Sequence, residues 1–208
     1  KIKGCSMAVV TNAGVPGVIV ADAASKHKVK LPQFSAKTIE AVKEINPHAS
    51  NPLDLIGDAK PTDYKTALRV LQSDSEIDLV YALLTPQSMT NPERVADIIV
   101  ALNKRKPIMA SFIGGTDVSN PRRYLKDQNV VEFETTERGI KALSQLENYY
   151  ARKKIKKVFD QKTKQNPLIV KMLKEKNQLT MEESFKLINE VGIQTPKTIF
   201  FSTKEELN

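Results

Sequence analysis

The stretch VVTNAGVPGVIVADA, residues 9–23, joins an apolar run to a small-residue loop and then, without a break, to a helical pattern. A buried strand that feeds a helix in this way points free main-chain N–H groups, and the positive end of the helix dipole, at the carboxyl edge of a sheet. Phosphate is the usual occupant of that position. Gly14 and Gly17 permit close approach of the backbone, but neither a P-loop lysine nor the G-x-G-x-x-G spacing is present. Taken alone, the pattern is equally compatible with a tight turn.

Apolar runs on either side of this stretch alternate with helical patterns. The runs at 7–10, 77–84, 107–113 and 130–133, with 53–56 as a shorter candidate, predict strands buried on both faces. Helical spacing relates three sets of apolar residues: Tyr64, Ala67, Leu68 and Leu71; Val95, Ile98, Ile99 and Leu102, behind Asn91 as N-cap and Pro92; and Ile140, Leu143 and Leu146 within 135–152. This alternation predicts an α/β fold, a doubly wound parallel sheet.

Composition narrows the class of protein. The chain has 208 residues and a net charge of +8, and no apolar run approaches the ~18 residues of a membrane span. Its single cysteine, Cys5, excludes an internal disulfide framework and fits a cytoplasmic location. With two histidines, it also argues against a Cys/His metal site, so no metal is expected. The chain begins at Lys1 without an initiator Met or a signal peptide, and we expect it to start inside a longer gene product.

The pattern changes after Tyr150. Residues 152–176 carry ten basic and two acidic side chains, which we interpret as a solvated helix end and linker. Nucleic-acid binding is the less favoured interpretation, because no series of aromatic side chains is spaced for base stacking. A new unit follows, with a capping box at Thr180–Glu183, Gly192 beyond the helix end, a strand at 197–201 and a second capping box from Ser202. This tail cannot bury a core by itself.

Three more loops follow predicted strands and should meet at the same edge of the sheet. They read NPLDLIGDA over residues 51–59, TPQSMT over 85–90 and FIGG over 112–115. Each alone is ordinary turn chemistry. In combination, V-T-N-A-G-x-P-G-x-x-x-A-D-A, N-P-x-D-L-x-G-D-A, T-P-Q-x-M-T and F-x-G-G resemble the third domain of the alpha portion of ADP-forming acetyl-CoA (acyl-CoA) synthetases, which are relatives of succinyl-CoA synthetase.

The tail from Met181 to Pro196 resembles the opening of the ATP-grasp domain that follows in single-chain members of that family. The resemblance thus covers nearly the whole chain. It implies a flavodoxin-like doubly wound domain over 1–151, a Lys-rich helix end and linker over 152–178, and the start of an ATP-grasp domain over 179–208, a short α+β appendage.

The family reaction converts acyl-CoA, ADP and phosphate to acid, ATP and CoA through a phosphohistidine. The resemblance places that histidine, and the CoA-binding and nucleotide-binding regions, outside this chain. It implies that the parent enzyme uses CoA, ADP or ATP, phosphate and Mg²⁺, that its CoA-binding, phosphohistidine and ATP-grasp domains are the partners of this chain, and that the assembly is oligomeric. The isolated chain is expected to bind no cofactor and to be inactive. The acyl group and the choice of ADP or GDP stay open.

By match to the family motif, one helix mouth would cradle the phosphate and the other loops would line the approach to it. The expected phosphate-binding residues are Asn12, Ala13, Gly14, Val15, Pro16, Gly17 and Val18, and the expected lining residues are Asp54, Gly57, Asp58, Gln87, Gly114 and Gly115. The family commonly has a second glycine where this chain has Val15. A positive φ at Val15 would cost about 1 kcal/mol or more.

Other charged residues are interpreted as surface groups. His27 and His48 are expected to be exposed, and Arg122 and Arg123 to be solvated rather than bound to a phosphate or an acidic partner. Two alternative functions stay open. One is a ligand-sensing, non-catalytic portion of a protein acetyltransferase. The other is a free-standing flavodoxin-like binding module.

Overall fold

The computed structural model describes residues 5–153, 167–175, 178–190 and 192–201. The chain divides into two compact units, Lys1–Ile155 and Lys156–Asn208. The boundary lies close to the end of the predicted first domain.

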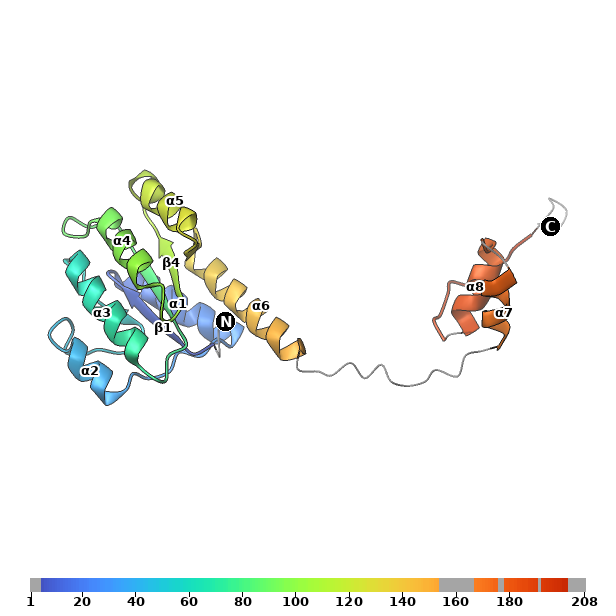
Figure 1. Ribbon diagram of the computed structural model, residues 1–208, viewed down its shortest axis with the longest axis horizontal. Helices are drawn as coiled ribbons and strands as arrows, with labels where there is room; N and C mark the ends of the chain where they lie inside the picture. Colours follow the sequence, from blue (N-terminus) through green and yellow to red (C-terminus); the bar gives the residue numbers. More distant parts are fainter. Residues whose placement is uncertain (1–4, 154–166, 176–177, 191, 202–208) are drawn as a thin grey trace. The chain divides into compact units, whose positions relative to one another are not determined.

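The first unit is built on a sheet of five parallel strands in the order β2-β1-β3-β4-β5 (Figure 1). The strands are β1 Met7–Thr11, β2 Leu53–Asp54, β3 Leu79–Leu84, β4 Ile108–Phe112 and β5 Val131–Glu132. Each lies inside or within a residue of a predicted run. This strand order is that of flavodoxin, which confirms the predicted fold class.

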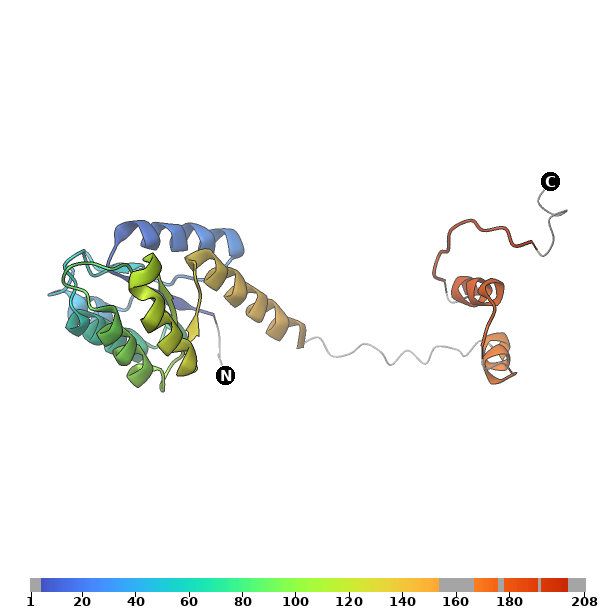
Figure 2. The ribbon, with the colours of Figure 1, turned by 90° about the horizontal axis from the view of Figure 1, so that it is seen from above.

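Helices cover both faces of the sheet (Figures 1 and 2). They are α1 Gly14–His27, α2 Ala36–Val42, α3 Pro61–Ser73, α4 Pro92–Leu102, α5 Ser119–Asp127 and α6 Thr136–Lys153, with a 3₁₀ turn, η1, at Gly115–Val118. Because side chains alternate along a strand, β1 serves two cores. Met7 and Val9 pack with residues of α1 and α6, whereas Ala8 and Val10 pack with residues of α3, α4 and α5.

Helix starts follow the chemistry that the sequence predicts. The Asn91 side chain accepts a hydrogen bond from the Arg94 amide at 2.8 Å, and Pro92 takes the first position of α4. Tyr64, Leu68 and Leu71 of α3 are fully buried, as their spacing predicts. Helix α2 was not predicted, because only Thr38 and Val42 of its residues are buried and two residues give no detectable periodicity.

The edge strand β2 is short, and the side chain of Asn51, which precedes it, makes hydrogen bonds to β1 in place of further strand residues. The Asn51 Oδ1 accepts a hydrogen bond from the Val9 amide at 3.0 Å while its Nδ2 donates to the Met7 carbonyl at 2.8 Å. The Asn51 amide thus pairs with β1 as a neighbouring strand would. This contact fixes the chain just before the loop that carries Asp54.

The second unit contains two helices in its described residues, α7 Pro167–Glu175 and α8 Met181–Glu190. The predicted capping box before α8 is confirmed: the Thr180 amide donates to Glu183 Oε2 at 3.0 Å, and the Glu183 amide donates to Thr180 Oγ1 at 3.3 Å. Gly192 has the positive φ, 81°, expected beyond a helix end. Helix α7 falls in the segment interpreted as a linker. The basic run before it suggested a linker, although the helix itself, PLIVKMLKE, is rich in apolar residues.

The predicted strand at 197–201 is wrong, since residues 193–201 form no strand. A strand needs a hydrogen-bonded neighbour, and the described part of this unit offers none. The capping box from Ser202 lies outside the described residues. Among the helices described in both units, none is long and apolar enough to cross a membrane.

Candidate functional site

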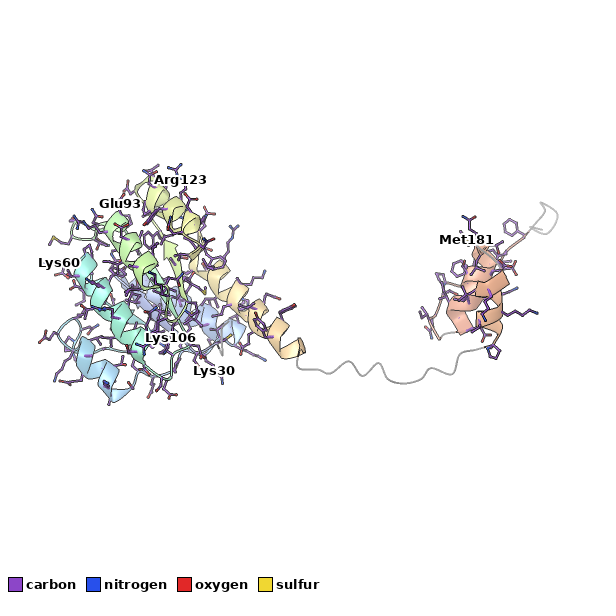
Figure 3. The ribbon with its side chains drawn as sticks, in the orientation of Figure 1. Lys30, Lys60, Glu93, Lys106, Arg123 and Met181 are labelled. Carbon is purple, nitrogen blue, oxygen red and sulfur yellow. The ribbon has the colours of Figure 1, made fainter. Side chains whose placement is uncertain are left out.

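The fold directs attention to the point where the strand order reverses, between β1 and β3. Ligands of open α/β sheets bind outside the carboxyl ends of the strands at this switch point. In Figure 3, Lys60 and Glu93, at the start of α3 and α4, mark the carboxyl edge, and Lys106, which precedes β4, marks the opposite one. The structure places every predicted site residue at the carboxyl edge, in the segments that follow β1, β2, β3 and β4.

Asn12 closes the switch point with its own side chain, which is fully buried. Its Nδ2 donates to the Thr85 carbonyl at 2.8 Å and to Thr90 Oγ1 at 3.1 Å. Its Oδ1 accepts from the Thr85 amide at 2.9 Å and from the Thr85 hydroxyl at 3.2 Å. Thr90 then donates to the Ala59 carbonyl at 2.6 Å. The Asn12 side-chain amide therefore has no hydrogen-bonding capacity left for a phosphate. Its role is to join the loops after β1, β2 and β3.

The main-chain N–H groups that lack an internal partner lie two and three residues after Asn12, at the start of α1. The Ala13 amide donates to Thr11 Oγ1 at 3.1 Å and is satisfied. In a helix whose N-cap is Ala13, the first internal hydrogen bond is donated by Gly17. Pro16 has no N–H, so the amides left without an intrahelical partner are those of Gly14 and Val15. Of the predicted Asn12–Val18 cradle, these two groups are the ones available to an anion.

Val15 carries no backbone strain, since it is absent from the residues with positive φ and forms part of the first turn of α1. The side chain that replaces the family's glycine is exposed. Gly17 packs closely against its neighbours: a Cβ there would make contacts of 3.4 Å with Thr11 Cγ2 and 3.6 Å with Pro52 Cβ. Gly17 and Pro16 are buried and hold α1 against the sheet.

Asp54, at the end of β2, lies beside the mouth of α1. A Cβ built on Gly14 would lie 3.5 Å from Asp54 Oδ2, and Asp54 Oδ1 accepts a hydrogen bond from the Ile56 amide at 2.9 Å. A carboxylate is favourable at a helix N-terminus. It also opposes a second anion at the same place.

Sequence reasoning missed Ile56, which follows Asp54. It has φ +68° and is 53% exposed. A β-branched residue in this region of backbone space is strained, and such strain clusters at functional loops. Single-sequence patterns carry no sign of it, because the residue type argues against that conformation.

The remaining lining residues differ in placement. Gly57 and Asp58 are exposed, and a Cβ on Gly57 would meet nothing within 4 Å. Gln87 Nε2 donates to Thr85 Oγ1 at 3.3 Å, so it adjoins the Asn12 network. Gly114 lets two loops approach, since a Cβ there would collide with the Pro86 ring, and Gly115 has φ +59°.

The other charged candidates lie elsewhere. Arg122 is not simply solvated: its Nε donates to Oε1 of the buried Glu132 at 2.6 Å, and Lys126 Nζ lies 3.1 Å from Oε2. Arg123 is exposed and its Nη2 donates to Asn120 Oδ1 at 3.2 Å.

His27 is not placed to serve the mouth of α1. His27 ends α1, roughly 20 Å from its mouth at 1.5 Å per residue. It is half-buried rather than exposed, and His48 is exposed as predicted. In the described residues, no group of three or more His, Cys, Asp or Glu side chains is arranged to hold a metal ion.

The chain is similar to known proteins in sequence and in fold. Residues 7–156 match the Ligase-CoA domain family. The chain is 36% identical over 225 residues to the ADP-forming acetate–CoA ligase of Methanocaldococcus jannaschii, covering 99% of this chain and 32% of that protein. It is 29% identical over 201 residues to the ADP-forming acetate–CoA ligase I of Archaeoglobus fulgidus, covering 92% and 29%.

A solved structure agrees. The dinucleotide-forming acetyl-coenzyme A synthetase 1 of Ca. Korarchaeum cryptofilum, in complex with phosphate and ADP, matches with a TM-score of 0.65 at 25% identity, over 74% of this chain and 36% of that one. The chain therefore spans about a third of the length of the relatives that it matches. The match over residues 7–156 and the flavodoxin strand order lead to one assignment: this chain belongs to the Ligase-CoA domain family of the ADP-forming acyl-CoA synthetases.

Proposed function

We propose that this chain is the phosphate-binding part of a larger ADP-forming acyl-CoA synthetase, which converts acyl-CoA, ADP and phosphate to acid, ATP and CoA. The observation that carries the proposal is the pair of unpaired amides of Gly14 and Val15, which open a helix at the switch point of the sheet. Main-chain donors suit this task because they hold a dianion without offering a competing nucleophile.

The Asn12 network and Asp54 give the site its character. The network ties the loops after β1, β2 and β3 together, so the donors are positioned before an anion arrives. Asp54 opposes the anion electrostatically. Binding is therefore weak, which suits a phosphate that must leave the mouth to react.

The rest of the parent enzyme supplies the remaining chemistry. We infer that its phosphohistidine, its CoA-binding domain and its nucleotide-binding lysines lie in regions outside this chain, and that residues 179–208 begin the ATP-grasp domain. Mg²⁺ would accompany the nucleotide there. We further propose a cytoplasmic, oligomeric assembly.

Phosphate titration of the ¹⁵N-labelled chain tests the site. We expect the amide resonances of Gly14 and Val15 to move. Gly14→Pro deletes one donor at a helix position that proline favours, behind an Ala13 whose extended φ of −150° and ψ of 134° suit a following proline. Loss of one charge-assisted hydrogen bond should weaken phosphate binding about tenfold or more.

Gly14→Ala is the matched control, because it keeps the N–H and its new Cβ makes an ordinary 3.5 Å contact with Asp54 Oδ2. It should bind phosphate about as well as the original chain. Equal weakening by both substitutions, or phosphate shifts confined to other residues, would contradict the site.

A further inference from the structure

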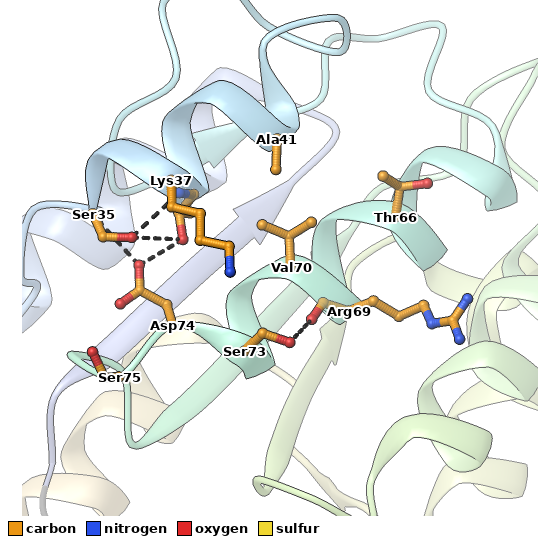
Figure 4. Close-up of a pocket in the computed structure, with 10 residues that line it drawn as sticks. Ser35, Lys37, Ala41, Thr66, Arg69, Val70, Ser73, Asp74 and Ser75 are labelled. Atoms are coloured by element: carbon orange, nitrogen blue, oxygen red, sulfur yellow. Dashed lines mark hydrogen bonds between the residues drawn. The ribbon is translucent and has the colours of Figure 1, made fainter.

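A second feature of the first unit lies between α2 and α3, away from Gly14 and Val15. A hollow of about 690 Å³ opens there along the C-terminal half of α3 (Figure 4). It is lined by Ser35, Lys37, Thr38, Ala41, Thr66, Arg69, Val70, Ser73, Asp74 and Ser75. Nothing in the proposed phosphate chemistry uses these residues.

The floor of the hollow is a carboxylate that is already satisfied. Asp74 is 4% exposed. Its Oδ2 accepts hydrogen bonds from the Thr38 hydroxyl at 2.6 Å and the Ser35 amide at 3.1 Å, and its Oδ1 accepts from the Glu76 amide at 3.0 Å. Asp74 is the one acid among the described residues that line the hollow, so little negative charge faces the space above it.

Two cations of the rim are without partners. In the described part of the chain, neither the Lys37 ammonium nor the Arg69 guanidinium makes a hydrogen bond or an ion pair. In Figure 4, Lys37 reaches from α2 toward α3, whereas Arg69 extends from α3 in the direction away from Lys37. The two charges therefore stand at different ends of the hollow.

The positive surface continues past Arg69. A neighbouring hollow of about 360 Å³ shares Arg69 and Ser73 with the first and adds Lys104 and Arg105. Arg105 Nη1 donates to Ser73 Oγ at 3.1 Å, which holds this guanidinium against α3. Four cations thus line one continuous surface across the two hollows.

These features select a ligand by its charge. Ala41 and Val70 are the apolar residues of the first hollow, and the aliphatic stems of Lys37 and Arg69 add apolar surface around them. Apolar surface of this kind does not distinguish one ligand from another, so we attribute the selectivity to the two charged ends. Exposed cations attract a single carboxylate weakly, but several charges on one small molecule multiply that attraction. The volume is in the range of small-molecule sites. We propose that the hollow between α2 and α3 binds a small molecule that carries two or more phosphate groups, held at one end by Lys37 and at the other by Arg69.

Titration of the 208-residue chain with inorganic triphosphate, followed by amide NMR and calorimetry, tests this proposal. We expect shifts at Lys37, Val70 and Ser73. Lys37→Gln and Arg69→Gln should each weaken triphosphate binding about fivefold. Lys141→Gln, which removes an exposed charge from α6 on the other face of the sheet, should leave it unchanged. Added salt should weaken binding, because the cations are exposed.

Three results would overturn the proposal: no shift at these residues up to millimolar triphosphate, equal weakening by Lys141→Gln, or tighter binding of a hexaglutamate peptide. The last would show a docking surface for an acidic protein segment. Shifts at Gly14 and Val15 report separately on the site of the proposed function, so either site can fail while the other stands.

Discussion

Single side chains decide how the switch point is used. Both polar atoms of the Asn12 side chain hydrogen-bond to Thr85 or Thr90. Leaving this buried side-chain amide unsatisfied would destabilise the fold. The residue is therefore a brace between loops. The donors available to an incoming anion are therefore main-chain N–H groups. Such donors respond to the charge of a ligand rather than to its identity.

Asp54 supplies the first prediction. Its carboxylate lies beside Gly14, so it repels an anion that the start of α1 attracts. Asp54→Asn should tighten phosphate binding about fivefold, since removing one charge at roughly 5 Å in a wet site changes the interaction by about 1 kcal/mol. The measurement is the phosphate dissociation constant from amide shifts.

Asp22→Asn is the control for that measurement. It removes the same charge from the exposed face of the same helix, two turns beyond the mouth, and phosphate affinity should change little. Weaker binding in Asp54→Asn would show that the carboxylate assists the anion, for example through a shared proton or cation. Unchanged binding would show that its charge does not act on the anion.

Elements with strong periodicity were predictable, and elements defined by their neighbours were not. Helix α3 was predictable from its apolar spacing, because Tyr64, Leu68 and Leu71 all face one core. The motif around Asn12 did not indicate that its side-chain amide points inward, since a single sequence does not show which groups a side chain will meet. The pairing of Arg122 with Glu132 joins α5 to β5 and leaves no local pattern.

Helix α2 is attached to α3 through one carboxylate, which leads to a pH prediction. Burial raises the pKa of Asp74, but hydrogen bonds from the Thr38 hydroxyl, the Glu76 amide and Ser35 lower it more, and the net pKa lies below its ordinary value of 3.8. A lowered folded-state pKa gives stability that is fully present above pH 3.8 and is lost as the pH falls through the folded-state value.

Asp74→Asn should therefore lower the free energy of unfolding by about 2 kcal/mol at pH 7, because its bonds are no longer charge-assisted. The difference from the original chain should shrink as the pH falls from 3.8 through the lower folded-state pKa, because the folded carboxyl becomes neutral only there. Urea unfolding at pH 7 and pH 3 measures both values. Asp22→Asn serves as the exposed control, and a difference independent of pH would contradict the assigned charge.

The whole chain corresponds to a part of its relatives. Helix α8 has no buried residue among those described, and Met181, Ile199 and Phe201 are exposed by half or more. Exposed apolar side chains of this kind indicate a surface that another segment covers. The Methanocaldococcus relative contains a counterpart of 99% of this chain within 32% of its own length, which supports the proposal that other regions of the parent enzyme complete the second unit.

This partition leads to the last prediction, that the isolated chain forms no ATP from acetyl-CoA, ADP and phosphate. Transfer requires a nucleophile within reach of the bound phosphate. Among the described residues, His27 lies at the far end of α1 and His48 is exposed in the loop before β2.

A luciferase assay should therefore read the same with the native and the heat-denatured chain, with the full-length Methanocaldococcus ligase as the positive control. Phosphate binding without turnover would support the division of labour, because a helix mouth can hold phosphate without supplying the groups that make it react. ATP above the denatured background that survives Gly14→Ala and is lost in Gly14→Pro would instead place catalysis within this chain, and the phosphohistidine would then have to be sought at His27 or His48.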